Sequence, residues 1–451
     1  MSDQQLVKTK SMLQIFFILV LAAVAFLVFR ARINTGVALA LIWSTYTLEQ
    51  FLQFAHGFFR SNGFLVNVAT VLIVIGSILY SVSTGRMKRV KLTTSHYLWI
   101  ALFGWVTLSV VWGSFKEADQ ILIQSIPYLM GFVILGPFCA QNDKQIDNAV
   151  QTTVFFGGLV LAGMLFCSFG SRGLSLGFEG GKEIEGNPLA VATYGGYVST
   201  CALFSIFHKR GNVIFLVLKL AIAILGLYTI VKSGSRGQLA AVVVACGIWL
   251  PVTGGMTFKW SNILLLMLAI GVFIGGVSFV GEVGLTDRWE TGSLTADRDS
   301  RFSAVMFMVN KYIEAGPAYW LVGLGTSESY KYLDTYPHFV PVEVLIEEGL
   351  VGFALFFAFL TGITRSGWRV LSSANISLET RINVGCLLTL FTFQFGLSLK
   401  QGSLIGSPLL FCIGLCIAIS VRRILADDKR KLLRAGRPFP MPANFRQGHQ
   451  Q

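Results

Sequence analysis

Long apolar runs alternate with short polar connectors along most of this chain of 451 residues. A helix needs about 20 mostly apolar residues to cross a hydrocarbon layer of roughly 30 Å, and many of the runs reach that length. Helices are the expected form because backbone polar groups in lipid must be satisfied within their own segment. The pattern therefore predicts an all-α integral membrane protein with about 12 or 13 transmembrane helices. The predicted spans are 12–29, 34–54, 64–82, 96–113, 121–140, 148–168, 188–207, 213–231, 237–255, 262–281, 339–364, 382–399 and 406–421.

The connectors indicate which way the spans run. Lysine and arginine gather around residues 86–91, 208–210 and 365–381 and in the tail from Arg422, so we assign these segments to the cytoplasm. Thirteen crossings would put the N-terminus outside, so we expect one early segment not to cross fully and both ends to be cytoplasmic. Counting alternate sides places the following segments outside: 114–120, 169–187, 232–236, 282–338 and 400–405.

Composition and charge agree with this class of protein. Of all residues 54% are hydrophobic and 13% are charged, and the formal net charge is +13. The basic residues lie mostly in connectors, as the positive-inside rule expects, so topology explains the charge and we expect no nucleic-acid partner. The cysteines fall in or beside apolar runs, which indicates neither a disulfide framework nor a metal cluster. They are Cys139, Cys167, Cys201, Cys246, Cys386, Cys412 and Cys416.

One long polar segment interrupts the apolar pattern and holds most of the outward-facing titratable groups. We expect the chemistry of the protein to take place there, and we expect amphipathic helices within the segment. The resulting organisation has five parts: a cytoplasmic or interfacial N-terminus (1–11), a helical membrane region (12–281), the long outer segment (282–338), further membrane helices (339–421) and a basic cytoplasmic tail (422–451).

The polar run 232–238, KSGSRGQ, separates two strongly apolar predicted helices. Its arginine, Arg236, is predicted at the outer membrane boundary, flanked by Ser235 and Gly237. A guanidinium offers bidentate hydrogen bonds suited to a diphosphate, and the exposed N–H groups of a following helix would strengthen such an anion site. The alternative is an arginine that only anchors a helix end at the lipid surface.

His338 stands where the outer segment re-enters the membrane as a helix. Pro341 suits the first turn of that helix, so the histidine is predicted just ahead of it at the water boundary. An imidazole there can accept a proton from an attacking hydroxyl at neutral pH, although an incidental histidine is the alternative. Glu343 and Glu347 share one face of the helix, and Glu347 is expected to hold an arginine or backbone donors.

Two further cations, Arg298 and Arg301, lie early in the outer segment, ahead of a Gly-x-Gly at 323–325. If the segment folds back over the membrane, Arg301 would join Arg236 in neutralising one anionic group. Arg298 is expected to be solvated, or paired with Asp297 or Asp299. The outer loops contain few acidic residues at metal-ligand spacing, which favours chemistry without a metal ion, although Asp287, Asp297 and Asp299 keep a metal site open as the alternative.

These features occur in a fixed order: Ser-Arg-Gly at a helix end, an arginine in a long outer segment, Gly-x-Gly, then a histidine with Glu nine and Gly eleven and fourteen residues later. The ordered set resembles the O-antigen ligase and polymerase superfamily over roughly residues 215–365. One departure is Phe339, where the family usually has Asn, and it bears on the orientation of the imidazole and on acceptor choice. The positions that match the family motifs are Arg236, Arg301, His338, Glu347, Gly349 and Gly352.

The resemblance implies an integral membrane glycosyltransferase of the GT-C type. Members take a glycan from undecaprenyl diphosphate on the periplasmic face of the bacterial inner membrane and pass it to an acceptor, so the outer segments would be periplasmic. The implied reaction needs no cofactor or metal and inverts the anomeric carbon. Arg236 and Arg301 would bind the diphosphate, and His338 would deprotonate or orient the acceptor hydroxyl. Substrate-binding roles are expected for Ser235, Gly237, Glu347 and Arg298.

Three functions stay open at this point. The first is an O-antigen ligase that attaches polymer to lipid A-core, and the second is a polymerase of the same superfamily that extends carrier-linked repeat units; a ligase that glycosylates proteins is a variant of this chemistry. The third is a flippase or transporter without bond formation. Intramembrane charges such as Glu49 and Lys219 are few, which disfavours the transporter. The ligase is slightly favoured.

Overall fold

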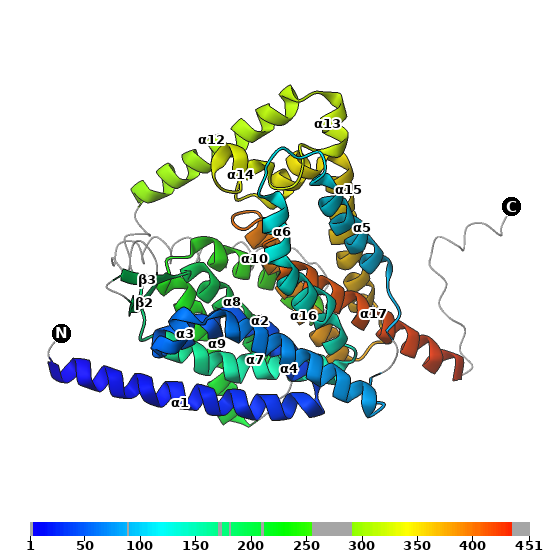
Figure 1. The fold of residues 1–451 in the computed structure, drawn as a ribbon. Coiled ribbons are helices and arrows are strands. Elements are labelled where there is room, and N and C mark those ends of the chain that lie inside the picture. Colours follow the sequence, from blue (N-terminus) through cyan, green and yellow to red (C-terminus); the bar gives the residue numbers. More distant parts are fainter. Residues whose placement is uncertain are drawn as a thin grey trace.

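The computed structural model describes residues 3–87, 90–169, 174–179, 182–208, 212–254 and 291–434, and helices make up most of this part (Figure 1). The helices are α1 (Asp3–Ile33), α2 (Thr35–Ala55), α3 (Gly57–Ser61), α4 (Phe64–Ser83), α5 (Thr94–Ser109), α6 (Ala118–Tyr128), α7 (Asp143–Met164), α8 (Pro188–His208), α9 (Val213–Lys232), α10 (Arg236–Thr253), α12 (Thr291–Glu314), α13 (Pro317–Val322), α14 (Glu328–Leu333), α15 (Val340–Leu371), α16 (Leu378–Ser398) and α17 (Pro408–Arg434).

Every predicted span that falls on described residues contains helix, and the span at 262–281 lies outside them. Eight helices in the described part are long and apolar enough to cross a membrane: α1, α4, α6 with its continuation to Cys139, α8, α9, α10, α15 and α17. This is fewer than the predicted twelve. Helix α5 has only 16 residues, and α2, α7 and α16 carry too many polar positions along their length. The architecture is that of a helical membrane protein.

The outward faces of several helices are apolar, as a lipid environment requires. On α9, Ile214 is 71% exposed and Val217 is 59% exposed, and α4 presents Leu72 in the same way at 62%. A row of large exposed apolar side chains would be unfavourable in water, because contact between apolar surface and water costs free energy. These faces are therefore suited to contact with hydrocarbon.

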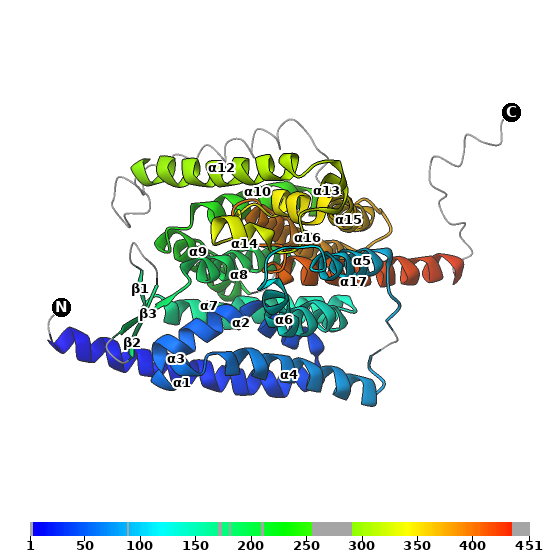
Figure 2. The ribbon, with the colours of Figure 1, turned by 45° about the horizontal axis from the view of Figure 1, so that its top comes forward.

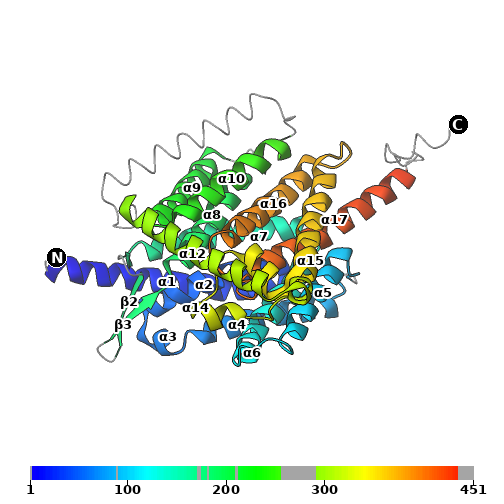
Figure 3. The ribbon, with the colours of Figure 1, turned by 90° about the horizontal axis from the view of Figure 1, so that it is seen from above.

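The helices pack into one bundle around a continuous apolar core. The most extensive pairs are α8 with α9, α10 with α16, α2 with α7, and α5 with α15. Helix α12 crosses one side of the bundle, with α13 and α14 beside it, whereas α1 and α4 lie along the opposite side (Figures 2 and 3). The long outer segment thus contains helices, as predicted, and all three of them contact α15.

The predicted helix at 121–140 is interrupted. Helix α6 ends at Tyr128, a π-helical turn follows over Leu129–Ile134, and a 3₁₀ turn covers Gly136–Cys139. Pro127 lies inside the end of α6 and Pro137 inside the 3₁₀ turn, and each lacks the N–H that a regular helix would use. Two prolines ten residues apart explain why this apolar run changes helical form.

A small antiparallel sheet occupies the connection predicted as a loop at 169–187. Its strands are β1 (Ser168–Phe169), β2 (Leu174–Glu179) and β3 (Lys182–Gly186), in the order β1-β2-β3. Strand β2 packs on α2 and α3, with Leu174 and Leu176 buried. The alternation of apolar and polar residues in LSLGFE is a strand signal, but it covers only six residues and is easily missed.

Helix α15 changes direction at Gly349, where φ is 66° and ψ is −167°. Two carbonyl groups just before Gly349 accept hydrogen bonds from the segment that precedes α14. Leu324 N–H donates to Ile346 O at 2.8 Å, and Gly325 N–H donates to Glu347 O at 2.9 Å. A Cβ on Gly323 would lie 2.0 Å from Glu347 O. The Gly-x-Gly and the glycine of the final motif therefore allow two backbone segments to touch.

Candidate functional site: a cation cluster beside two connected cavities

Arg301 lies in the middle of α12 and reaches the turn that joins α16 to α17. Its Nη1 donates to the carbonyl of Lys400 at 2.9 Å. The helix is held in place by a small apolar cluster in which Met308 and Tyr312 pack with Ile346 of α15. Two residues that are 99 positions apart are thus joined, so α12 of the long outer segment lies against the turn after α16. A shared role of Arg301 and Arg236 in neutralising one anionic group stays a prediction.

The start of α10 meets the same turn from another side. Arg236 is the first residue of α10, and a Cβ on the following Gly237 would lie 2.1 Å from Lys400 Cδ. Next along the helix, Gln238 Nε2 donates to Gln401 Oε1 at 2.7 Å. The Arg301 side chain therefore meets the turn that holds Lys400, and the backbone of Arg236 begins the helix that packs on the same turn. Arg236, Arg301 and Lys400 are called the cation cluster below.

Ser235 and Arg298 have different positions relative to this cluster. Ser235 is 1% exposed, and its Oγ accepts a hydrogen bond from Ser233 Oγ at 3.0 Å, so it stabilises the turn before α10. Arg298 lies on α12, three residues before Arg301, and its side chain lies outside the described residues. Gly237 allows close packing against Lys400. The predicted substrate-binding roles of these residues stay predictions.

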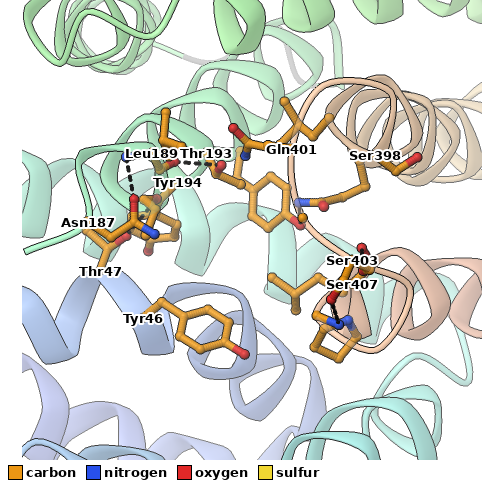
Figure 4. A pocket seen from close by; sticks show the side chains of 18 of the residues that line it. Tyr46, Thr47, Asn187, Leu189, Thr193, Tyr194, Ser398, Gln401, Ser403 and Ser407 are labelled. Atoms are coloured by element: carbon orange, nitrogen blue, oxygen red, sulfur yellow. Dashed lines mark hydrogen bonds between the residues drawn. The ribbon is translucent and has the colours of Figure 1, made fainter. Parts of the chain in front are cut away.

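A cavity of about 420 Å³ lies against the Lys400–Gln401 turn. Figure 4 shows Tyr46 of α2 on one side, Asn187 and Thr193 at the start of α8, and Ser398 and Gln401 at the end of α16. None of the lining residues is charged, whereas aromatic rings and hydroxyl or amide groups are frequent. This larger cavity therefore combines flat apolar surfaces with neutral hydrogen-bonding groups.

Tyr336 connects the larger cavity with His338. It lines the cavity, and its ring meets the imidazole edge-on with the ring centres 4.5 Å apart. His338 has φ 59° and directly precedes the first residues of α15, where Pro341 lies in the first turn, as predicted. His338 itself does not line the larger cavity, so Tyr336 stands between the two.

Tyr330 and Tyr336, which both line the larger cavity, are held in the neutral form. Burial raises the pKa of the Tyr330 hydroxyl to about 12, with nearby acidic groups acting in the same direction. Burial and the nearby Glu343 raise the pKa of Tyr336, and the Arg301 guanidinium opposes that shift. At neutral pH the two hydroxyls can donate and accept hydrogen bonds, and neither acts as a base.

A smaller cavity of about 310 Å³ adjoins the larger one. The two share part of their lining, including Tyr46, Tyr330 and Ser403, and the smaller one is also lined by Glu343 and Glu347. Glu347 accepts the backbone N–H groups of Ser327 at 2.8 Å and Ser329 at 3.0 Å, so the expectation of backbone donors is correct. Glu347 therefore holds the turn before α14 and still lines the cavity.

The described residues contain no group of three histidine, cysteine, aspartate or glutamate side chains arranged to hold a metal ion. All seven cysteines are buried as free thiols. A bound anion at this site would consequently rely on the cation cluster and on backbone N–H groups for its positive partners.

Two residues of this site were missing from the sequence analysis, Lys400 and Tyr336. Lys400 is a basic residue in a connector predicted on the outer side, where the positive-inside rule disfavours lysine, and that exception was an available signal. Tyr336 stands two residues before His338 without any distinguishing pattern. Only the fold places its ring between the imidazole and the cavity.

The sequence matches no protein-family model and no curated protein.

Proposed function

We propose that this protein is a membrane glycosyltransferase that moves a glycan from undecaprenyl diphosphate to an acceptor hydroxyl, most simply as an O-antigen ligase acting on lipid A-core. One observation carries the proposal. Arg301 donates to the carbonyl of Lys400, the helix that Arg236 begins packs on the same turn, and this turn borders an uncharged cavity rich in aromatic rings. The ordered motifs that resemble the O-antigen ligase superfamily also support a glycosyltransferase function.

The cation cluster has the chemistry to hold a lipid-linked diphosphate. Guanidinium groups bind phosphate oxygens through paired hydrogen bonds, and lysine adds a compact charge. Arg236 begins α10, so the N-terminal end of that helix adds its dipole and backbone N–H groups. Negative charge grows on the diphosphate as it leaves, and fixed cations stabilise that charge more in the transition state than in the ground state.

The larger cavity has the chemistry to hold sugar rings. Tyr46, Tyr336 and other aromatic residues offer flat faces for the C–H side of a sugar, and Ser398 and Gln401 offer hydrogen bonds for its hydroxyls. An uncharged lining suits a neutral glycan and leaves the diphosphate to the cations next to it. The arrangement separates recognition of the glycan from recognition of its carrier.

In the proposed reaction the oxygen of an acceptor hydroxyl attacks the anomeric carbon of the donor glycan. The bond from that carbon to the diphosphate oxygen breaks, and its electron pair leaves with the diphosphate. His338 accepts the hydroxyl proton. The edge-to-face contact with the Tyr336 ring orients the imidazole. Attack opposite the leaving group inverts the anomeric configuration, and the reaction takes place on the periplasmic face of the bacterial inner membrane.

The test is a transfer assay with purified protein in detergent, undecaprenyl diphosphate-linked glycan and EDTA. Lipid A-core and carrier-linked repeat units are supplied separately as acceptors. Product on lipid A-core is expected for a metal-independent ligase, whereas a ladder of carrier-linked glycans would identify a polymerase. Arg236→Ala, matched for expression and thermal stability, is expected to form no product. Folded wild-type protein that modifies neither acceptor would contradict the proposal.

A further inference from the structure

A third cavity, of about 340 Å³, lies along the second half of α17. The start of α17 lines the larger cavity, whereas residues 419–430 of the same helix line this one. Parts of the connector between α4 and α5 and the turn before α7 complete its wall. The volume is within the range of roughly 300–1,000 Å³ that is usual for small-molecule sites. This cavity is called the basic cavity below.

The wall of the basic cavity carries a strong excess of positive charge. Five of its lining residues are basic and one is acidic: Arg86, Lys91, Arg422, Arg423 and Arg430, and Asp427. Asp427 lies 3.7 Å from Arg430, in an exposed pair that contributes little in water. A single carboxylate cannot balance five cations, which repel one another when they share one cavity. A bound anion would relieve that repulsion.

Two consecutive arginines of α17 are fixed by acceptor groups of two different connectors. Arg422 Nη1 donates to Lys91 O at 3.1 Å and to Leu92 O at 2.6 Å. Arg423 Nη1 donates to Gln141 Oε1 at 2.7 Å. Arg422 is exposed and uses only Nη1 in these bonds, so its other N–H groups are accessible to a ligand. The wall therefore presents accessible donors at fixed positions.

The basic cavity lies where apolar spans end. The span Phe64–Ser83 ends three residues before Arg86, and the span Ala118–Cys139 ends two residues before Gln141. In α17 the uninterrupted apolar run ends directly before Arg422. These segments all belong to the predicted cytoplasmic side. The cavity is thus expected at the depth of the lipid head groups, next to the hydrocarbon layer.

Apolar surface beside the cavity favours a lipid over a soluble anion. Leu92, whose carbonyl accepts from Arg422, is 43% exposed. Val82, four residues before Arg86 on α4, is 55% exposed. Acyl chains can cover these side chains while the head group reaches the cations, whereas a soluble phosphate would leave the same side chains in water. Basic pockets between membrane helices are suited to anionic head groups.

We propose that the basic cavity binds the phosphate group of an anionic phospholipid, for which phosphatidylglycerol is the probe. Its guanidinium groups donate paired hydrogen bonds to the phosphate oxygens, and Lys91 adds a compact charge. The bound lipid joins α17 to the connector after α4 and to the turn before α7. This site goes beyond the proposed glycosyltransferase function and does not depend on it.

Lipid binding is measured by native mass spectrometry of the delipidated full chain in detergent. Phosphatidylglycerol and zwitterionic phosphatidylcholine are titrated separately, and inorganic phosphate is added as a competitor. One phosphatidylglycerol is expected to bind about tenfold or more tightly than phosphatidylcholine, because several cations act on its net charge. Equal affinities for the two lipids would overturn the proposal. Competition by inorganic phosphate at concentrations equal to those of the lipid would identify a soluble anion as the ligand and overturn the assignment to a lipid.

The double variant Arg86→Gln with Lys91→Gln removes two cations from the wall. Both residues are exposed, so the fold should be retained, and melting temperatures without lipid check this. The affinity for phosphatidylglycerol should fall by about tenfold or more. The matched control is Lys144→Gln with Arg369→Gln, which removes one lysine and one arginine from exposed positions that do not line the basic cavity. Equal affinities of the double variant and the control would overturn the proposal.

Asp427→Asn tests the site by a gain of affinity, which damage to the fold cannot produce. The substitution removes the acidic group of the wall and keeps a side chain of similar size. The affinity for phosphatidylglycerol should rise by about fivefold, as expected for one charge beside a head group, and the affinity for phosphatidylcholine should change less. An Asp427→Asn protein that binds phosphatidylglycerol no more tightly than the wild type would contradict the proposal.

Discussion

Lys400 shows how much a single residue in a short connector contributes to the site. Its carbonyl accepts from Arg301, and its side chain packs against Gly237 beside Arg236. Its alkyl stem fills the space that the missing side chain of Gly237 leaves, and its ammonium adds positive charge to the cluster. One residue thus joins the end of α16 to α10 and α12.

Replacing Lys400 with methionine should weaken donor binding and leave the fold intact. Methionine keeps an unbranched stem to pack on Gly237 but removes the charge, so the KM for the diphosphate donor should rise about tenfold or more. Transfer kinetics at varied donor concentration measure the effect. Lys311→Met, on the exposed side of α12, is the control and should leave this KM unchanged. Equal donor KM values in both variants would remove Lys400 from the diphosphate site.

The kink in α15 is the feature on which the site depends at the level of elements. Gly349 adopts φ 66°, and a Cβ there would lie 2.4 Å from both Gly323 N and Leu321 O. This close contact brings the segment before α14 against the first turns of α15. The contact adds to the hydrogen bonds by which Glu347 holds the backbone of Ser327 and Ser329 against α15.

Gly349→Ala should therefore destabilise the protein by about 3 kcal/mol or more, through a strained φ and overpacking against the backbone. The seven buried thiols allow unfolding to be followed with a thiol-reactive fluorescent dye in detergent. Gly362→Ala, in a regular part of the same helix with its nearest neighbour at 3.8 Å, should be neutral or slightly stabilising. Equal melting temperatures for the two variants would show that the close contact is unimportant.

On the scale of the whole molecule, polar connectors gather into two groups. One contains the cation cluster and the 113–115 segment, where Glu328 accepts from Phe115 N–H at 2.7 Å. The other joins the predicted cytoplasmic connectors, because Arg422 donates to Leu92 O at 2.6 Å and Arg423 donates to Gln141 Oε1 at 2.7 Å. Segments that were predicted on the same side of the membrane therefore contact one another.

Cysteine labelling in spheroplasts tests which group faces the periplasm. Lys116→Cys and Asn375→Cys both place a thiol at an exposed position, in the first and the second group respectively. A membrane-impermeant maleimide should label Lys116→Cys in intact spheroplasts and Asn375→Cys only after permeabilisation. The wild type should stay unlabelled because its thiols are buried. The reverse pattern would place the cation cluster in the cytoplasm and contradict the proposed reaction.

The sequence alone determined the helices and part of the site. Apolar runs of membrane-spanning length specify helices because lipid leaves no other partner for the backbone, and each described run contains helix. Pro341 placed His338 ahead of α15, and the Ser-Arg-Gly run placed Arg236 at the start of α10. These are local effects of hydropathy, proline and helix ends, which act within a few residues of one another.

Only the tertiary structure decided which distant residues meet. Arg301 and Lys400 are 99 positions apart, Glu343 and Leu404 are 61 apart, and no pattern along the chain encodes either contact. The short strands at 168–186 and the break after Tyr128 also depend on packing against neighbours as well as on local preference. Cavities and charge clusters arise where several helices leave space between them, so they are properties of the packed bundle and not of any one segment.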